Sequence, residues 1–303
     1  MKKSLILTNQ ERFSRRTKIF FRICTVCFCV CLCAFFIVAV EASAQERAYD
    51  FPDGSAPVSV YLEGRRILPE ESVIIESVTY VPVRAFSDEM GAESVFWNAI
   101  SRTATVKKDG ITVNIGDKAT YIEASGRILY SPTGVKNIND RLFVPIRAIA
   151  RAFSVNVDWN NSTRTVVLTS TGRTITSGDN YYNSTDLYWL SRIINAEASG
   201  ESLLGMIAVG NVVLNRKASN QYPSTVYGVI FDRNGGTQFS PVSMGTIYRT
   251  PSQASIIAAK ICLDGYSVDN RILFFMNPKI ATSNWISKNR PFAFTIGQHD
   301  FYY

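Results

Sequence analysis

Residues 186–216 read DLYWLSRIINAEASGESLLGMIAVGNVVLNR, and this stretch decides the fold of the carboxy-terminal part of the chain. Apolar side chains recur at helical spacing over 186–198, which predicts a helix with one buried stripe. At about 100° per residue, Glu197 falls inside that stripe, between Ile193 and Ile194. A carboxyl group that faces a core must be paired, hydrogen-bonded or protonated, and a general acid needs the protonated form. Glu197 is therefore the first candidate for chemistry.

The downstream sequence predicts the rest of a small domain. Ser199-Gly200 interrupts the helical pattern, and a second helix, apolar on most sides, is expected from about residue 201 to 215. A third helix is predicted between Thr250, as its N-cap, and Gly265, with a proline as its first residue. Residues 271–303 alternate aromatic and turn residues, which indicates strands and loops. We expect a domain that is helical at its start and mixed at its end.

An internal repeat organises residues 56–170, upstream of these helices. The run VPVRAF at 81–86 returns 63 positions later as VPIRAI at 144–149. A Trp-Asn-x-x-x-Arg-Thr element at 97–103 returns at 159–165. In each copy a short strand is expected to meet a helix at the proline, and a strand pair is expected around the Trp-Asn turn. The sequence therefore predicts a duplicated small α+β unit.

These two repeated elements resemble the copper amine oxidase N-terminal-like domain of exported bacterial proteins. Copper binding is not expected, because oxidase chemistry requires several histidine ligands and the whole chain has one histidine. Trp97 and Trp159 are predicted to pack in a core at their strand ends, with sugar-stacking platforms as the alternative. We expect the repeat to bind an envelope or wall polymer. Residues 171–185 are polar and aperiodic and are predicted to form a linker.

The amino terminus has the order of an export signal. Basic residues precede an uncharged apolar run from Ile23 to Val40, and the small residues Ala42-Ser43-Ala44 follow. We predict cleavage after Ala44 and a location in the cell envelope, the cell wall or outside the cell; a retained membrane anchor is the alternative. The first 44 residues hold seven of the 32 Lys/Arg and two of the 25 Asp/Glu, which leaves 25 and 23. A net charge of +2 removes the main support for a nucleic-acid partner.

The number and positions of the cysteines and the histidine exclude several kinds of catalytic or metal site. Five of the six cysteines lie in the apolar run, so no internal disulfide is expected in the mature chain. Cys262 and His299 are then the remaining residues of their kinds, which argues against a metal cluster and leads us to expect no cofactor. Cys262 lies on the inward face of a predicted helix, which favours a buried, inert thiol. No GxSxG element provides a serine nucleophile, so acid–base chemistry by a carboxyl group is the strongest option.

Six ordered elements within residues 186–303 resemble the SleB-type spore-cortex-lytic and cell-wall hydrolase family. They are Glu197-Ala198-Ser199-Gly200-Glu201, Ala208-Val209 with Val213-Leu214-Asn215-Arg216, Tyr222-Pro223 with Gly228-Val229-Ile230, Gln238-Phe239-Ser240-Pro241-Val242, Phe275-x-Asn277-Pro278, and Ile296-Gly297-x-His299-x-Phe301-Tyr302. The resemblance implies a lysozyme-related, helix-rich α+β catalytic domain that follows the repeat. It also implies a cell-wall glycosidase that cleaves the β-1,4 bond between muramic acid and glucosamine in peptidoglycan. Spore members of the family act as lytic transglycosylases and leave 1,6-anhydromuramic ends.

By this resemblance Glu197 is the catalytic glutamate, first as acid and then as base. A transglycosylase needs no second carboxylate to activate water, unlike the usual two-carboxylate glycosidases. Two alternatives stay open. In the first, Glu197 is structural, paired with a buried arginine such as Arg216, and the protein binds the wall without cleaving it. In the second, the protein is a water-using muramidase with Glu201 or Asp232 as its second carboxylate.

The remaining candidate residues have weaker signals. Glu201 is expected to cap the second helix through the helix dipole, with an assisting carboxylate or a residue that orients the substrate as the alternatives. The expected substrate-binding residues are Gln238, Ser240 and Asn277 as hydrogen-bonding groups, Phe239, Tyr248 and Trp285 as stacking rings, and His299, which either lines the cleft or holds the terminal strand. The expected partner is the glycan strand of peptidoglycan. Spore cortex lysis during germination and remodelling of the vegetative wall are both open, because the spore enzymes carry a different amino-terminal domain.

Overall fold

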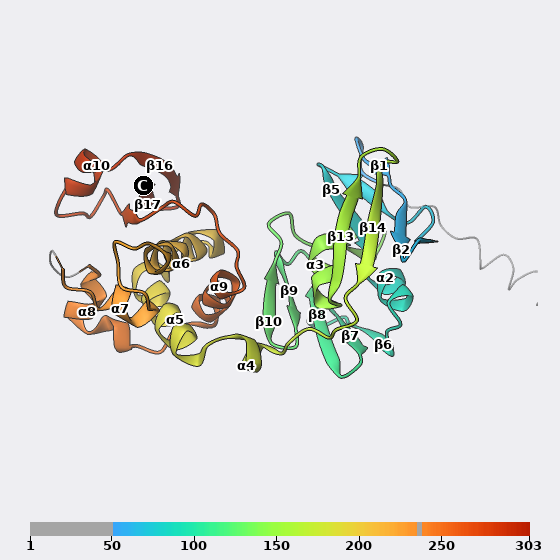
Figure 1. The fold of residues 1–303 in the computed structure, drawn as a ribbon, viewed down its shortest axis with the longest axis horizontal. Coiled ribbons are helices and arrows are strands. Elements are labelled where there is room, and N and C mark those ends of the chain that lie inside the picture. The colour runs from blue at the N-terminus through green and yellow to red at the C-terminus, as the bar shows by residue number, and fades with distance from the viewer. Residues whose placement is uncertain (1–50, 235–237) are drawn as a thin grey trace, which may run out of the picture. The chain divides into compact units, whose positions relative to one another are not determined.

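The computed structural model describes residues 51–234 and 238–303, and the predicted export signal lies outside the described residues. Strands dominate the amino-terminal part of the described chain and helices the carboxy-terminal part, which confirms the predicted α+β class (Figure 1). In the two described ranges, we find no helix that combines the length and the apolar character needed to cross a membrane.

Short strands and two helices make up residues 56–170. The strands are β1 (Ala56–Pro57), β2 (Val60–Leu62), β3 (Arg65–Ile67), β4 (Val73–Ile75), β5 (Val78–Pro82), β6 (Ser94–Asn98), β7 (Thr103–Lys108), β8 (Ile111–Gly116), β9 (Tyr121–Ala124), β10 (Arg127–Tyr130), β11 (Lys136–Ile138), β12 (Arg141–Pro145), β13 (Val155–Asn160) and β14 (Thr165–Ser170). The helices are α2 (Val83–Glu89) and α3 (Ile146–Ala152). The strands pair into sheets of order β1-β4-β5-β12-β11, β10-β9-β8-β7-β6 and β13-β14-β2-β3. Side chains from all three sheets and both helices share one core.

The two copies of the repeat are built in the same way. β5 leads into α2 at Pro82, and β12 leads into α3 at Pro145, because proline has no N–H to leave unpaired at a helix start. In the first copy, Nη2 of Arg84 donates to the carbonyl of Val95 at 3.0 Å. In the second copy, Nη1 of Arg147 donates to the carbonyl of Val157 at 3.1 Å. The arginine of each VPxRA element therefore holds the strand that carries the tryptophan of the same copy.

The prediction that Trp97 and Trp159 pack in a core is wrong. Their side chains are 40% and 38% exposed. They occupy equivalent positions in β6 and β13, and each of these strands stands at the edge of its sheet with a strand partner on one side only. A ring near the end of an edge strand has too few neighbours to be enclosed. The alternative, a pair of sugar-stacking platforms, stays a prediction.

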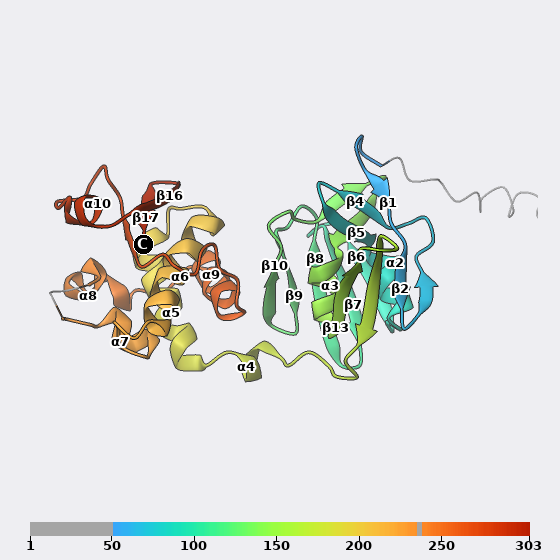
Figure 2. The same ribbon diagram turned by 45° about the horizontal axis from the view of Figure 1, so that its top comes forward.

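Helices dominate the carboxy-terminal part. They are α4 (Gly178–Tyr181), α5 (Ser184–Ala198), α6 (Leu203–Ala218), α7 (Val226–Ile230), α8 (Ser240–Met244), the 3-10 turn η1 (Thr246–Tyr248), α9 (Gln253–Leu263) and α10 (Trp285–Asn289). The strands β15 (Phe274–Met276), β16 (Phe292–Ile296) and β17 (His299–Tyr302) form a sheet of order β15-β17-β16. Figures 1 and 2 both show this sheet and α10 on one side of the α5–α6 pair, and α7 and α8 on the other.

The three predicted helices and the terminal strands are present, and small polar residues set the helix starts. The apolar stripe of α5 faces the core: Leu190, Ile193 and Ile194 are 0% exposed, and Leu187 is partly buried. Ser202 caps α6, since its Oγ accepts from the N–H of Gly205 at 3.2 Å. Ser252 caps α9 in the same way, so the prediction of Thr250 as N-cap is wrong by two residues.

The segment predicted as a linker, residues 171–185, is folded in part. It contains α4, and Ile175 and Tyr182 within it are buried. The Tyr182 hydroxyl accepts from the N–H of Ile128 at 3.0 Å and donates to Asp264 at 3.3 Å. The described residues of this segment therefore belong to the same compact unit as the elements before and after them.

Gly210 allows α6 to approach its neighbours closely, which gives a first prediction. A Cβ on Gly210 would lie 2.7 Å from Sγ of Cys262 and 2.8 Å from Cδ1 of Ile194. Both neighbours are buried, so they have little room to move. Gly210→Ala is expected to lower the free energy of unfolding in urea by about 1–3 kcal/mol, despite the higher helix propensity of alanine.

Two controls separate crowding from other effects of this substitution. Gly200→Ala should be close to neutral, because a Cβ there meets no described atom within 4 Å. Cys262→Ala should destabilise less in the Gly210→Ala background than alone, since it makes room for the new methyl group. A Gly210→Ala variant more stable than wild type would contradict the close packing of α6.

Candidate active site

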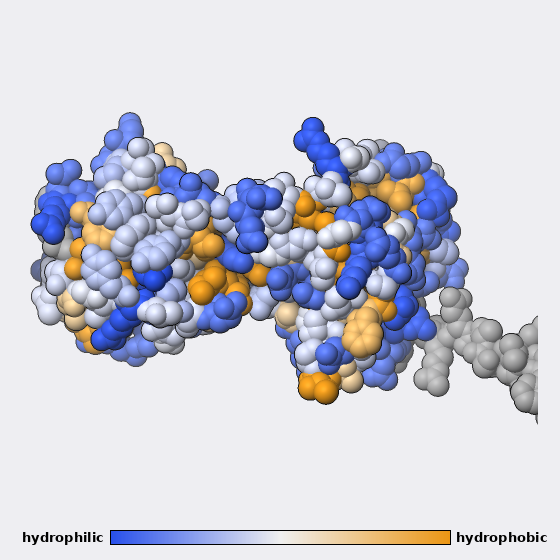
Figure 3. Space-filling view, turned by 90° about the horizontal axis from the view of Figure 1, so that it is seen from below, coloured by the Kyte–Doolittle hydropathy of each residue, from blue (hydrophilic) through white to orange (hydrophobic). Residues whose placement is uncertain are grey.

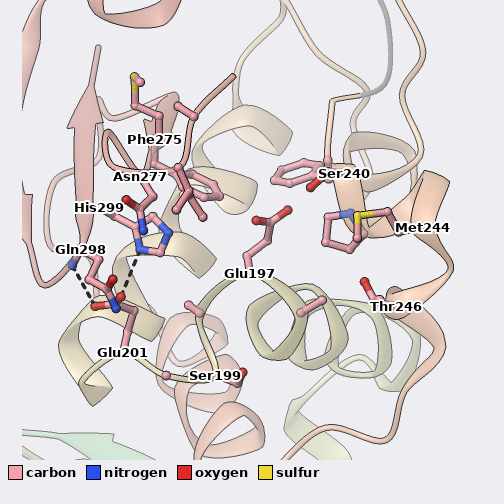
Figure 4. Close-up of a pocket in the computed structure, with 18 of the residues that line it drawn as sticks. Glu197, Ser199, Glu201, Ser240, Met244, Thr246, Phe275, Asn277, Gln298 and His299 are labelled. Carbon is pink, nitrogen blue, oxygen red and sulfur yellow. Dashed lines mark hydrogen bonds and ion pairs between the residues drawn. The ribbon is translucent and has the colours of Figure 1, made fainter. Parts of the chain in front are cut away.

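Glu197 lies in the last turn of α5, at a cleft of about 1020 Å³ in the carboxy-terminal part of the chain. Figure 4 shows its carboxyl group directed into the open space between two walls. One wall carries Asn277, directly after β15, and His299, the first residue of β17. The other carries Ser240 and Thr246, from α8 and η1. The cleft thus lies between the terminal sheet and the α8–η1 segment, with Glu197 between them.

The carboxyl group of Glu197 forms no hydrogen bond or ion pair with any other described residue. Arg216, the partner that a structural role would require, is otherwise engaged: its Nε donates to the carbonyl of Leu273 at 2.7 Å and its Nη1 contacts Gln238 at 3.4 Å. Burial raises the pKa of Glu197 from 4.5 to about 7. A large fraction of Glu197 is therefore protonated at neutral pH, as a general acid requires.

Glu201 has a different role from the one its position suggested. Ser202 is the N-cap of α6, so the prediction that Glu201 caps this helix is wrong. The Glu201 side chain is 7% exposed, and its Oε2 accepts from the N–H of Gln298 at 3.2 Å. Its Oε1 lies 3.8 Å from Nδ1 of His299. Glu201 therefore joins the α5–α6 turn to the β16–β17 hairpin, which is visible in Figure 4.

His299 combines the two roles that were predicted as alternatives. It lines the cleft and is also the first residue of β17. The residue is 6% exposed, and its Nδ1 has no hydrogen-bond partner in the described ranges. Burial lowers the pKa of His299, and the nearby Glu201 carboxylate only partly opposes this effect. His299 is accordingly a neutral ring at the wall of the cleft.

The structure separates the predicted substrate-binding residues into two groups. Those that line the cleft are Gln238, Phe239, Ser240, Asn277 and His299. Tyr248 and Trp285 are 62% and 52% exposed but lie outside the cleft lining. Phe239 is only 2% exposed and packs in the core, so the prediction that its ring stacks on a sugar is wrong. Asp232 does not belong to the described lining, and its carboxylate accepts from the N–H of Asn234 at 3.0 Å.

Sequence reasoning missed several residues that line the cleft. They are Asn195, Met244, Thr246 and Arg249 from the α5 and α8–η1 side, and Met276, Ile280, Ser283, Ile286 and Gln298 from the opposite side. Met244 and Ile280 are 70% and 76% exposed, so the rim of the cleft is apolar at two points. Arg249, Ile280, Ser283 and Gln298 lie in turns and loops, and Met244, Thr246, Met276 and Ile286 lie in elements of three to five residues, which are too short for a periodic pattern to mark a functional face.

No set of three His, Cys, Asp or Glu side chains in the described parts of the chain is placed to hold a metal ion. The acidic residues that line the described cleft are Glu197 and Glu201. Since Glu201 is held by the hairpin, Glu197 is the carboxyl group that faces the open space. The Glu197 carboxyl group can therefore donate a proton to a bound molecule and accept one back at the same position in the cleft.

The raised pKa of Glu197 predicts that this residue lowers the stability of the fold above neutral pH. Its pKa is about 7 in the folded protein against 4.5 as the ordinary value, so ionisation opposes folding. The penalty is absent below pH 4.5, grows as the pH rises toward 7 and is complete above 7. Glu197→Gln should be more stable than wild type by about 1–3 kcal/mol at pH 8, and this difference should vanish near pH 4.

Urea unfolding of both proteins across this pH range measures the difference directly. All other titrating groups are shared, so the comparison isolates Glu197. A stability difference that does not change with pH would show that the Glu197 carboxyl is not desolvated.

Comparison with known proteins defines the class of this domain. Residues 200–302 match the cell wall hydrolase family, so the carboxy-terminal part of the chain is a cell wall hydrolase domain. Residues 61–168 match the copper amine oxidase N-terminal domain, and this assigns the amino-terminal part. Both resemblances predicted from the sequence are confirmed.

The carboxy-terminal domain is similar to spore enzymes in particular. It is 36% identical over 126 residues to a spore cortex-lytic enzyme of Bacillus cereus. The aligned region covers 42% of this chain and 47% of that enzyme. The spore cortex-lytic enzyme of Bacillus subtilis is 34% identical over 120 residues, 40% of this chain and 38% of that enzyme. The chain thus spans less than half the length of these relatives. The catalytic domain of the germination-specific lytic transglycosylase SleB of Bacillus anthracis aligns over its full length with 43% of this chain, at 35% identity and a TM-score of 0.38.

Proposed function

We propose that this protein is an exported cell-wall glycosidase that cleaves the bond between N-acetylmuramic acid and N-acetylglucosamine in peptidoglycan as a lytic transglycosylase. The observation that carries the proposal is the Glu197 carboxyl group, which is desolvated, unpaired among the described residues and directed into a cleft. Membership of the carboxy-terminal domain in the cell wall hydrolase family supports the substrate class. The similarity to spore cortex-lytic enzymes supports peptidoglycan as the polymer.

The proposed reaction uses one carboxyl group twice. Protonated Glu197 donates its proton to the glycosidic oxygen while the bond from that oxygen to C1 of the muramic acid breaks, which frees the glucosamine-ended fragment. The resulting carboxylate then accepts the proton of the C6 hydroxyl of the same muramic acid. The C6 oxygen forms a bond to C1 and closes a 1,6-anhydro ring, and Glu197 is protonated again. No water is consumed, so atoms and charge balance within the sugar chain and one side chain.

The placement of the other acids supports this reaction over hydrolysis with two carboxylates. Glu201 lines the described cleft, but its carboxylate is 7% exposed and accepts from the backbone of the hairpin. Asp232 lies outside the described lining. A base that activates water must face the sugar beside the acid, and neither residue does so. The non-catalytic alternative would need a paired Glu197, and the free carboxyl group argues against it.

The proposed mechanism predicts that cleavage slows as the pH rises above neutral. Because Glu197 must be protonated to start the reaction and its pKa is about 7, the competent fraction falls about tenfold per pH unit above that value. The rate of muropeptide release at saturating peptidoglycan, measured between pH 5 and 9, checks this. A rate that rises through pH 7 would instead indicate that Glu197 must be ionised at the start.

The proposed function is tested by digesting purified peptidoglycan with the full protein and identifying the products by mass spectrometry. Peptidoglycan from spore cortex and from vegetative wall should both be digested, so that the measurement identifies the preferred substrate. Anhydromuramic ends are the expected result. Reducing ends would indicate a water-using muramidase, and binding without any released fragment would indicate a wall-binding protein that does not cleave.

A further inference from the structure

A second group of exposed side chains stands out on the carboxy-terminal domain, outside the cleft lining. We call it the aromatic platform, and it consists of Tyr188, Trp189, Tyr227, Phe231 and Tyr248. The three tyrosines are 46%, 48% and 62% exposed. Figure 3 shows several aromatic rings gathered on the exposed face of this part of the molecule. An exposed aromatic group of this size marks a binding surface more often than a structural one.

Trp189 is the centre of the platform, and the other rings surround it. Its ring centroid lies 4.9 Å from that of Tyr188, 5.4 Å from Tyr227, 5.0 Å from Phe231 and 6.2 Å from Tyr248. Tyr227 also stacks on Phe231 at 4.4 Å. Such contacts fix the rings in place, so little conformational entropy is lost when a ligand binds to them.

The tyrosines of the platform contribute little to the fold itself. Trp189 and Phe231 pack against the domain core, but Tyr188, Tyr227 and Tyr248 are not part of that cluster. Their hydroxyl groups form no hydrogen bond within the described ranges, although buried tyrosines usually find a partner. Each of these tyrosines therefore has an exposed part of its ring and a free polar tip, although Arg192 lies over one face of Tyr188 and Phe231 over one face of Tyr227.

Two arginines give the platform a positive charge. The guanidinium of Arg192 stacks over the ring of Tyr188, 3.6 Å from its centroid. Arg249 directly follows Tyr248 and is exposed. Neither arginine forms an ion pair with a carboxylate in the described part of the chain. Asp186, the acid nearest in sequence to Tyr188, is paired with Lys217 at 2.8 Å.

The platform is continuous with the cleft through two elements. α5 carries Tyr188 in its first half, Arg192 near its middle and Glu197 in its last turn. Tyr188 and Glu197 are separated by about 13 Å along the helix axis. In η1, Thr246 lines the cleft while Tyr248 belongs to the platform. Arg249 lines the cleft and adjoins the platform in sequence. A long polymer that occupies the cleft can therefore continue onto the platform.

We infer that the aromatic platform binds a further stretch of the peptidoglycan glycan strand, outside the cleft. A pyranose ring has an apolar C–H face and a polar rim, which match the face and the hydroxyl of an exposed tyrosine. The carboxylates of the peptide stems match Arg192 and Arg249. The platform thus holds the strand while Glu197 acts on a bond further along. The identity of the polymer rests on the proposed function.

The test measures binding without cleavage. In the full chain with Glu197→Gln, Tyr188, Tyr227 and Tyr248 are all replaced by alanine, and binding to insoluble peptidoglycan is measured by co-sedimentation. The affinity is expected to fall about tenfold or more. Replacing the same three tyrosines by phenylalanine is the matched control and should retain most of the binding, because the ring faces remain. In proteins with native Glu197, the alanine variant should cleave whole peptidoglycan more slowly but cleave a soluble tetrasaccharide at the wild-type rate.

Unchanged binding and unchanged cleavage of whole peptidoglycan would overturn the inference. Equal loss on the tetrasaccharide would also overturn it, because the substitutions would then act through the cleft. If the triple alanine variant unfolds, two milder variants are measured in the same assays: the double variant Tyr188→Ala/Tyr248→Ala, and the single variant Arg192→Gln. A wild-type protein that binds through the platform but releases no fragment would contradict the proposed function and leave the platform standing.

Discussion

Glu197→Gln is expected to reduce the release of muropeptides from peptidoglycan by about three orders of magnitude, the size of a lost general acid. Glutamine has nearly the same shape but cannot donate a proton to the glycosidic oxygen or take one from the C6 hydroxyl. In the proposed mechanism one carboxyl group serves both steps, and among the described residues that line the cleft no second carboxyl group faces the open space to compensate for its loss. Initial rates from chromatography of soluble fragments provide the measurement.

The variant should fold, which makes the loss interpretable. No hydrogen bond or ion pair to another described residue is broken, and removal of a desolvated carboxyl favours folding above neutral pH. Glu76→Gln, on an exposed turn in the amino-terminal part, is a control for the loss of one negative charge and should cleave like wild type. More than a tenth of the wild-type rate in Glu197→Gln would assign the proton transfer to another group.

Gly297→Ala is the second substitution expected to have a large effect. Gly297 has a φ of +60°, and a Cβ there would lie 1.8 Å from Oε2 of Glu201. The buried carboxylate would have to leave the N–H of Gln298, in a backbone conformation that alanine adopts poorly. We expect a loss of about 2–4 kcal/mol in the free energy of unfolding. Cleavage should fall as well, since His299 and the wall of the cleft move with the hairpin.

Two further variants separate crowding from backbone strain at Gly297. Gly172 has a φ of +66°, and a Cβ there would meet no described atom within 4 Å, so Gly172→Ala should lose only about 1 kcal/mol from strain. In a cycle with Glu201→Ala, the penalty for Gly297→Ala should fall toward that of Gly172→Ala. Urea unfolding measures each step. Equal effects of Gly297→Ala with and without Glu201 would show that the carboxylate does not occupy this space.

The position of Glu197 was predictable because it depends on one continuous helix. The apolar spacing of α5 fixes its phase, and the structure keeps that phase over the whole segment, with Ile193 and Ile194 enclosed. The clash between a carboxyl group and an apolar stripe is visible in the sequence alone. The sequence does not reveal that this side chain points into a cleft rather than toward a buried arginine. The walls of the cleft come from elements 40 to 100 residues away along the chain.

The predictions that failed are of two kinds. Some depend on contacts with residues that are distant in sequence, and others on which of two adjacent polar residues caps a helix. Glu201 contacts Gln298, 97 positions away, and no local pattern points to that contact. The N-cap of α6 is Ser202, one residue after Glu201, because the serine hydroxyl reaches the N–H of the first turn. Trp97 and Trp159 were expected in a core because tryptophan is large and apolar, but strand order decides which strands stand at an edge.

The origin of the oxygen at the new sugar end tests the central claim most directly. Peptidoglycan is digested in water labelled with heavy oxygen, and the muramic acid ends of the products are analysed by mass spectrometry. The proposed mechanism closes the ring with the C6 oxygen of the sugar, so the products should be anhydromuramic ends without label. Reducing muramic acid ends that carry one heavy oxygen atom would show attack by water and would contradict catalysis by Glu197 alone.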